Sequence, residues 1–325
     1  MTGPEHNEVE VRPYGPADQQ VWDGVVEASR SRHFFFRRGY MDYHCDRFQD
    51  ASRILFEGET PVAVFPANRA GTEIVSHGGL TFGGLLSDAK LTTRRTVAAL
   101  RALFAAYAGE GVTSLRYKAM PAIYHLVPAE EDLYALFVAD ATLVRRDCAA
   151  ALRPQDHPRP SKGRRAAIRR ARSAGFEVDR DEAFADFMQL EDQALRRRHG
   201  TAPVHTPAEM ELLAGAFPDH IKLFTARRDG ELYGGVLVYE TPTVAHAQYI
   251  AGTEAAYDEN ALDAVLGHLI EDVYADKRWF DFGISTTEDG RNLNTGLMRN
   301  KESFGGRAVA YDTYVVGLED VDALG

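Results

Sequence analysis

The chain is poor in cysteine and has no long hydrophobic run. Cys45 and Cys148 are the two cysteines among 325 residues, and their separation matches no metal-binding spacing. We therefore expect both to be reduced, buried side chains in a cytoplasmic protein. No apolar stretch approaches the ~20 residues that a membrane span needs, which predicts no membrane segment. The first eight residues are acidic and polar, so we expect no signal peptide.

Basic residues are fewer than acidic residues. The chain has 37 Lys and Arg against 48 Asp and Glu, a formal charge of −11, which argues against general coating of nucleic acid but permits a local basic patch. Nucleotide-binding motifs are missing too, because the glycine-rich stretch 76–85 follows neither the Walker nor the dinucleotide order. This stretch, which includes His77, is either a bulged strand where two backbones approach, or a surface of N–H groups for an acyl or anionic ligand.

Periodicity predicts two similar successions of elements, separated by the proline-rich segment 153–160. The first comprises helix 16–33, strands 52–56 and 61–66, helix 91–108, strand 114–118, helix 130–138 and strand 143–152. The second comprises helices 161–172, 181–200 and 207–217, strands 221–227, 232–240 and 243–250, helix 260–274, strand 279–284, a helix carrying Lys301, and strand 308–316. We predict an α/β (α+β) chain of two domains, 1–153 and 154–325, each a mixed, mostly antiparallel sheet flanked by helices.

Polar residues are concentrated where strand 279–284 ends. Asp281 interrupts this apolar strand, a polar loop follows, and the next helix carries Lys301. The carboxyl end of a strand and the loop after it form the usual ligand crevice of an α/β sheet. A connection whose polar residues only cap the helix would explain Ser285 but not Asp281, Asn294 and Lys301 together. We therefore expect a functional site here.

The two successions resemble the tandem arrangement of GNAT acyltransferases, and in particular the Fem-type aminoacyltransferases. The resemblance rests on segments spread over nearly the whole chain, namely 38–48, 76–84, 164–171, 223–227, 234–235, 245–249, 281–286 and 301–306. It implies a transferase that forms an amide bond, with aminoacyl-tRNA as the donor and an amine as the acceptor, in a cell-envelope precursor or a natural-product intermediate. A scaffold without activity is the third class of reading, because a fold alone does not fix function.

The resemblance also implies roles for residues of the second half. Lys301, followed by Phe304, resembles the Fem-type lysine in its Lys-x-x-Phe pattern, although Asn300 replaces the family's preceding phenylalanine. Lys301 is expected to stabilise a tetrahedral oxyanion, and Asp281 to orient it or accept the amine proton. The other expected catalytic residues are Tyr249 and Ser285, and the expected substrate contacts here are His246, Asn294 and Phe304. His246 and Tyr249 are three apart on one strand, which predicts that they face opposite sides.

The donor is suggested by a turn that departs from the usual GNAT pattern. GNAT enzymes hold the coenzyme A pyrophosphate on a glycine-rich turn before a helix N-terminus. The segment 251–260 has Glu254, Asp258 and Glu259 at this place, with one glycine and no arginine. These acids would repel a pyrophosphate, so we expect no cofactor. The Fem-type resemblance then implies aminoacyl-tRNA as the co-substrate. The alternative is a GNAT N-acetyltransferase that uses acetyl-CoA and acts on a sugar or cell-envelope precursor.

Two further groups of residues are assigned to substrates. Helix 161–172 is rich in basic residues and begins at a predicted Ser161 cap. It is either a solvated helix face or a contact for tRNA phosphates, and the candidates are Lys162, Arg164, Arg165, Arg169 and Arg170. In the first half the candidates for holding the acceptor, expected to be anionic, are Arg38, Tyr43, His44, His77, Arg116 and Lys118. No metal site is expected.

Overall fold

The computed structural model describes residues 9–156 and 159–319, and the chain divides into two compact units. The expectation about the first eight residues lies outside the described residues, as do positions 157 and 158 of the proline-rich segment. The first unit contains residues up to Asp147 together with Glu288–Arg291 and the segment from Ala310, and the second contains Cys148–Thr287 and Asn292–Val309. The last strand therefore contributes to the first unit, whereas the sequence division at 153 placed it wholly with the second.

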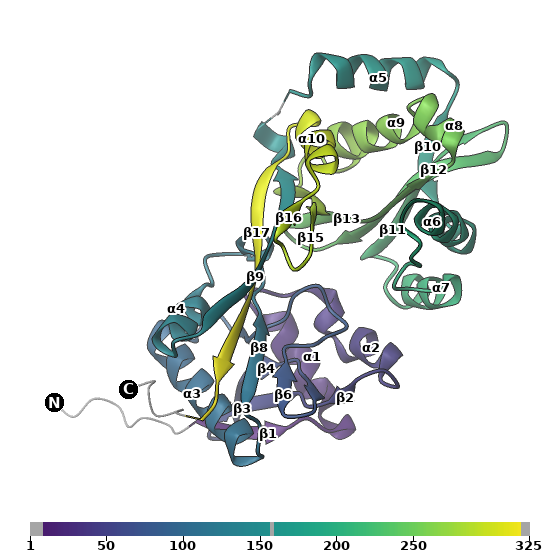
Figure 1. The fold of residues 1–325 in the computed structure, drawn as a ribbon. Helices are drawn as coiled ribbons and strands as arrows, with labels where there is room; N and C mark the ends of the chain where they lie inside the picture. The colour runs from purple at the N-terminus through teal and green to yellow at the C-terminus, as the bar shows by residue number, and fades with distance from the viewer. Residues whose placement is uncertain (1–8, 157–158, 320–325) are drawn as a thin grey trace. The chain divides into compact units, whose positions relative to one another are not determined.

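The first unit contains two groups of paired strands, with helices packed beside them (Figure 1). One group follows the order β1-β3-β4-β7, and the other contains β17-β8-β6-β5-β2, in which β6 and β8 are parallel and β8 and β17 are antiparallel. The elements are β1 (Val9–Pro13), α1 (Gln19–Ala28), α2 (Arg38–Met41), β2 (Gln49–Asp50), β3 (Arg53–Glu57), β4 (Thr60–Phe65), β5 (Asn68–Ala70), β6 (Glu73–Val75), β7 (Leu86–Ser87), α3 (Thr93–Gly109), β8 (Ser114–Lys118), α4 (Glu131–Val138) and β9 (Thr142–Leu152).

The second unit is built on the strand order β10-β11-β12-β13-β14-β9. Helices α5 and α9 cover one face of this sheet, and α6 and α7 lie on the other (Figure 1). The elements are α5 (Lys162–Ser173), β10 (Glu177–Asp181), α6 (Phe184–His199), α7 (Pro207–Ala216), β11 (Ile221–Arg228), β12 (Glu231–Glu240), β13 (Val244–Gly252), α8 (Glu254–Asp258), α9 (Ala261–His268), β14 (Trp279–Ile284), β15 (Thr286–Thr287), β16 (Asn292–Leu293), α10 (Thr295–Ser303) and β17 (Arg307–Gly317).

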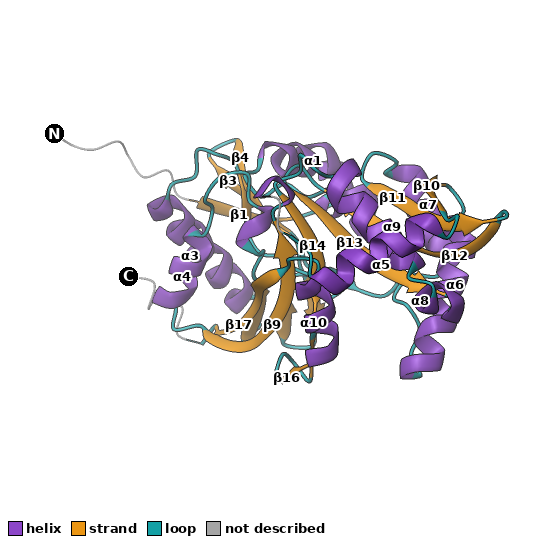
Figure 2. Ribbon diagram, turned by 90° about the horizontal axis from the view of Figure 1, so that it is seen from above, coloured by secondary structure: helices purple, strands orange, loops and turns teal. Residues whose placement is uncertain are grey.

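Each unit has its own apolar core. In the first, Leu100, Leu103 and Phe104 of α3 are buried against strand residues that include Leu55 and Leu115. In the second, α9 buries its alanine, valine and leucine side chains on β11–β13, and Figure 2 shows α5 and α9 lying over these strands. Two separate cores agree with the two domains that the length predicts.

Several predicted elements begin or end differently in the structure. The predicted helix 181–200 is shorter, because residues 177–181 pair with β11 as strand β10. The predicted helix 260–274 changes to a π-helical turn at Leu269–Val273. The expectation of two buried cysteines was wrong, since Cys45 is exposed after a 3-10 turn and Cys148 is half-buried. Within the described residues, no helix combines the length and the apolar character of a membrane span.

Candidate active site

The candidate site lies where the parallel strands β13 and β14 part. Their register pairs Val244 with Trp279, then the next two residues of each strand, and ends at His246 and Asp281. Beyond this pair β14 continues on its other side, where Ile284 pairs with Ala149 of β9 after a bulge. The two strands therefore diverge immediately after a histidine and an aspartate that lie side by side.

Asp281 is completely buried and both of its carboxylate oxygens have hydrogen-bond partners. Its Oδ2 lies 2.9 Å from Nδ1 of His246, and its Oδ1 accepts a hydrogen bond from the backbone N–H of Gly283 at 2.8 Å. Gly283 has a φ of +73°, which favours glycine, and this conformation turns the end of β14 back toward the carboxylate. A buried carboxylate needs such partners, because an unpaired buried charge costs several kcal/mol.

Lys301 reaches the same strand end from α10. Its side chain is buried, and its ammonium donates hydrogen bonds to the carbonyl oxygens of Gly283, at 2.8 Å, and Ile284, at 2.7 Å. Burial lowers the pKa of Lys301 to about 8, while the nearby Asp281 carboxylate acts in the opposite direction. An ammonium has three donors. With two used by the backbone, one remains for a ligand.

His246 and Tyr249 share one face of the sheet, so the prediction that they face opposite sides was wrong. His246 pairs with Tyr239 of β12, but Tyr249 pairs with Leu237. The intervening Gln248 is the extra residue of a β-bulge, and this residue shifts the alternation by one position. The hydroxyl of Tyr249 is 2.7 Å from Nδ1 of the buried His205, in the loop after α6.

The remaining predicted residues of this half have structural contacts of their own. The backbone N–H of Ser285 donates to Cys148, and its buried hydroxyl has no hydrogen-bond partner among the described residues. The side chain of Asn294 caps α10 by accepting a hydrogen bond from the N–H of Leu297. Phe304 is buried in the core, 5.8 Å from the ring of Phe282. Ser285 and Asn294 thus shape the loop before Lys301, and Phe304 anchors the end of its helix.

Helix α5 presents two kinds of basic residue. Ser161 caps its start as predicted, and Lys162, Arg165, Arg169 and Arg170 are exposed. Arg164 differs, because its guanidinium donates to Asp263 and to Ser303 Oγ and lies 4.3 Å from the centre of the Phe304 ring. Arg164 therefore ties α5 to α9 and α10, whereas the exposed four are available to a partner.

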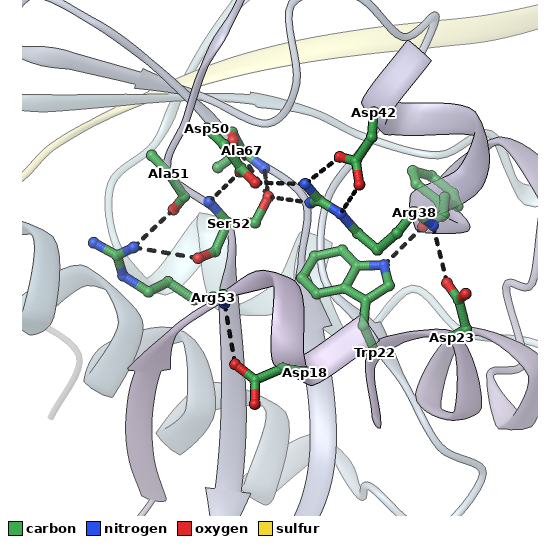
Figure 3. A network of polar contacts seen from close by, with 12 residues as sticks. Asp18, Trp22, Asp23, Arg38, Asp42, Asp50, Ala51, Ser52, Arg53 and Ala67 are labelled. Atoms are coloured by element: carbon green, nitrogen blue, oxygen red, sulfur yellow. Dashed lines mark hydrogen bonds and ion pairs between the residues drawn. The ribbon is translucent and has the colours of Figure 1, made fainter. Parts of the chain in front are cut away.

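A second concave site lies within the first unit. A cavity of about 560 Å³ is lined by residues that include Arg38, His44 and His77, three of the predicted acceptor contacts. Figure 3 shows Arg38 held between Asp42 and Asp50. The guanidinium also lies 3.9 Å from the centre of the Tyr14 ring. Two carboxylates thus accompany one guanidinium. This balance suits an uncharged or cationic group better than the anionic acceptor expected from the sequence.

Aromatic rings form much of the wall of this cavity. Phe48 lies 5.3 Å from His77 in the lining, and Tyr43, which is not part of the lining, stacks on His44 with ring centres 4.3 Å apart. Burial lowers the pKa of His77 to about 3, so this ring is neutral at physiological pH. His77 has a φ of +62°, an unusual conformation for a residue other than glycine.

The glycine-rich stretch after His77 is a place of close backbone approach. A Cβ added to Gly83 would lie 2.0 Å from the carbonyl oxygen of Ser76, and one at Gly84 would lie 2.6 Å from the hydroxyl of Tyr117. This stretch forms no regular strand between residues 76 and 84. Gly83 and Gly84 are therefore required by close packing. This agrees with the close approach of two backbones that the sequence suggested, although residues 76–84 form no bulged strand.

Arg116 and Lys118 lie on β8 of the same unit. Arg116 is paired with Glu73 on the neighbouring strand β6, at 3.2 Å. The ammonium of Lys118 donates to the carbonyl oxygens of His77 and Leu80, and burial lowers its pKa to about 8. Lys118 thus supports the backbone around His77.

Sequence reasoning did not single out His205, Asp42 or Asp50. His205 lies in a loop and meets Tyr249 only through the fold, so no local pattern identifies it. Asp42 follows Arg38 by four residues in a helical segment, the spacing of a helix ion pair, and this signal could have been used.

The turn after β13 carries acids in the arrangement that the sequence suggested. Thr253 caps α8, and its hydroxyl already accepts the N–H of Ala256. Glu254 is in the first turn of α8, and Glu259 forms an ion pair with Arg228. Glu254 is itself paired with Arg197 at 3.0 Å, and Glu259 is the C-cap of α8, so Glu254 is the carboxylate at this helix start.

Comparison with known proteins identifies the fold. Residues 161–289 match the family model described as an acetyltransferase (GNAT) domain. A crystal structure of FemX is similar over 94% of this chain and 96% of its own, with a TM-score of 0.68 and 11% identity. A tandem GNAT protein from the clavulanic acid biosynthesis pathway has a TM-score of 0.56 and 11% identity, over 96% of this chain and 99% of its own.

A third similar structure is that of L-PGS from Bacillus licheniformis. Its TM-score is 0.58 and its identity 12%, over 79% of this chain and 82% of its own. No curated protein sequence matches the chain. The matched domain and these folds together support a transferase with a tandem GNAT architecture that transfers an acyl group.

Proposed function

We propose that this chain is a tandem GNAT acyltransferase of the Fem type, which transfers an aminoacyl group from aminoacyl-tRNA to an amine and forms an amide bond. The observation that carries the choice of donor is the acidic turn after β13. A coenzyme A pyrophosphate placed at the start of α8 would meet Glu254 in the first turn, while Asp258 and Glu259 add negative charge at the other end of this short helix, so the residues present do not suit this group.

Lys301 has the central role in the proposed reaction. The acceptor amine attacks the ester carbonyl, and the negative charge that develops on the carbonyl oxygen requires a fixed donor. The ammonium of Lys301 is held by the carbonyls of Gly283 and Ile284, so it needs no rearrangement to supply its remaining N–H. The amide C–N bond forms, the ester C–O bond breaks, and one proton passes from nitrogen to the leaving ribose oxygen.

Substrate contacts are proposed in both units. In the second, the exposed basic residues of α5 would contact tRNA phosphates, which dominate affinity for nucleic acids. In the first, the cavity beside Arg38, His44 and His77 would hold part of the acceptor, with Tyr43 behind His44.

The donor is tested by binding and by transfer. We expect calorimetry with acetyl-CoA or CoA to show no saturable heat, and a labelled aminoacyl-tRNA to pass its amino acid to at least one member of a panel of amines. The alternative donor is acetyl-CoA, which the description of the matched family favours. A low-micromolar dissociation constant for acetyl-CoA, with acetyl transfer, would replace the proposal by this alternative.

Reversing the charge of the exposed face of α5 should weaken tRNA binding. In the double variant Arg165→Glu and Arg169→Glu, each lost phosphate contact is expected to reduce the slope of log affinity against log salt by about one. The control reverses two exposed residues of α3, Arg94→Glu and Arg101→Glu, which changes the net charge equally. Filter binding at several salt concentrations measures both. Equal losses in the two variants would mean that α5 has no specific role.

A further inference from the structure

We propose that His246 is the general base of the acyl transfer and that Asp281 is the residue that positions it. This inference rests on the proposed function, since it names the group that takes the amine proton. It also changes the roles suggested by the sequence, which placed His246 among the substrate contacts and gave the proton to Asp281. Asp281 is fully buried, so it cannot meet the substrate directly.

The contact within the pair favours one tautomer of the imidazole. Asp281 Oδ2 lies 2.9 Å from Nδ1 of His246, and an ionised carboxylate at this place can only accept, so the proposal assigns the proton to Nδ1. The lone pair is then on Nε2, at the opposite edge of the ring. Asp281 cannot rotate freely, because its Oδ1 is bound to the N–H of Gly283. A carboxylate that both orients an imidazole and stabilises its charged form is the arrangement that a histidine base requires.

The divergence of β13 and β14 after His246 leaves the Nε2 edge of its ring partly exposed. The side chain of His246 retains 13% of its exposure, although Asp281 beside it has none. A Cβ at position 283 would lie 3.3 Å from Cε1 and 4.0 Å from Nε2 of His246. Gly283 therefore leaves space against the ring edge that carries Nε2. The carbonyl of Gly283 also accepts a hydrogen bond from Lys301, so His246 and Lys301 both lie next to this glycine.

The proton transfers balance in this arrangement. As the amine nitrogen bonds to the ester carbonyl carbon, its proton passes to Nε2 of His246, and the imidazolium is paired with the buried Asp281. When the ester C–O bond breaks, the same proton passes to the ribose oxygen, which returns His246 to its neutral form. The other titratable groups on this part of the fold are Lys301, which is bound to the carbonyl of Gly283, Tyr249 on the same face of β13, and the buried Glu191 on α6, a helix that packs on β13.

The test replaces His246 by asparagine. The asparagine amide can donate to Asp281 as Nδ1 does, but it provides no second nitrogen to take a proton. We expect His246→Asn to fold normally and to lower kcat by about 10²-fold, since general bases contribute ~10²–10⁴-fold. The acidic limb of the plot of log kcat/KM against pH should disappear with the base. An unchanged limb with a rate within about twofold of wild type would overturn the proposal.

The chain offers a matched control in the same unit. His268 and Asp272 are also 2.9 Å apart through Nδ1 and Oδ2, but they lie four apart on an exposed helical surface. His268→Asn removes an equivalent bond away from the point where β13 and β14 diverge, and we expect it to leave the rate and the pH profile unchanged. An equal loss in both variants would indicate a general structural effect and would overturn the assignment.

A measurement without substrate separates this inference from the proposed donor. Long-range ¹⁵N NMR of the imidazole should show the Nδ1–H tautomer of His246 in the wild type, and this preference should be lost in Asp281→Asn. The opposite tautomer in the wild type would overturn the role of Asp281. Transfer from acetyl-CoA in place of aminoacyl-tRNA would overturn the donor alone, and a His246→Asn loss in that reaction would still support the base.

Discussion

Replacing Lys301 by methionine is expected to lower kcat about 10²–10³-fold, the usual loss when one oxyanion donor is removed. Methionine retains the apolar stem that the buried lysine packs into the site, but it donates no hydrogen bond. Lys301→Arg should restore only part of the rate, because a planar guanidinium cannot occupy the position of an ammonium between two carbonyls. Single-turnover kinetics with saturating substrate isolate the chemical step.

The stability of Lys301→Met must be measured with its rate. In the folded state the pKa of Lys301 is about 8, below its ordinary value of 10.5, so the folded protein binds this proton less tightly than the unfolded chain. Below pH 8 the charged lysine therefore costs stability, and this cost disappears as the pH rises from about 8 toward 10.5. Methionine removes the cost but leaves two carbonyls unbonded. These effects oppose each other, and we expect a shift in Tm of only a few degrees.

The same pKa predicts how turnover depends on pH. Only the protonated lysine carries the charge that stabilises the oxyanion, so kcat should fall as the pH rises through about 8. As a control, Lys277→Met removes a half-buried lysine of the second unit, which is bound to Glu240 and to the carbonyl of Thr241. It should lower stability and leave specific activity intact. Wild-type turnover in Lys301→Met would remove this residue from the mechanism.

Replacing Arg38 by methionine is expected to destabilise the first unit by about 3 kcal/mol. The Arg38 side chain is only 4% exposed, and it joins two acids (Figure 3). It also stacks on the Tyr14 ring. Its loss leaves Asp42 and Asp50 facing each other without their shared cation. Because these carboxylates are 44% and 36% exposed, water can solvate them, which keeps the cost at the lower end for a broken buried pair.

The neighbouring residue provides the control for Arg38. Arg37 also forms an ion pair, with Glu27, but its side chain is 34% exposed and its partner 49%. Arg37→Met should therefore cost about 0.5 kcal/mol or less. Urea unfolding followed by Trp22 fluorescence reports on the first unit, provided that Trp279 is replaced by phenylalanine, since the chain has two tryptophans. Equal losses for Arg37 and Arg38 would contradict the structural role of Arg38.

The sequence predicts the strand and helix order well because the apolar periodicity of most elements is strong. It also directs attention to Lys301 and Asp281, which flank one polar loop. It could not show that His246 meets Asp281, since they are 35 residues apart and meet only when β13 and β14 pair in parallel. The bulge at Gln248 is equally hidden, because no glycine marks it and period-2 reasoning assumes a regular strand.

The helical spacing of Arg164 predicts a buried position, but the basic residues around it favoured a surface role. Arg164 is spaced four and seven residues before Ile168 and Ala171, the buried face of α5, so helical periodicity places it toward the core. The density of basic residues around it suggested a surface role instead. Its ion pair with Asp263 requires a partner from a distant helix, which local patterns cannot supply.

The path of the last strand has a consequence for dissecting the chain. β8 of the first unit is bordered by β6 and by residues 313–317 of β17, which lie almost 200 residues later in the sequence. A fragment that ends near residue 147 would therefore leave one edge of β8 open, with N–H and C=O groups ready to pair with another molecule. A synthetic peptide covering β17 could close this edge by strand addition. We therefore expect the N-terminal half to act as a complementation system, in which solubility of the fragment depends on a strand supplied from outside.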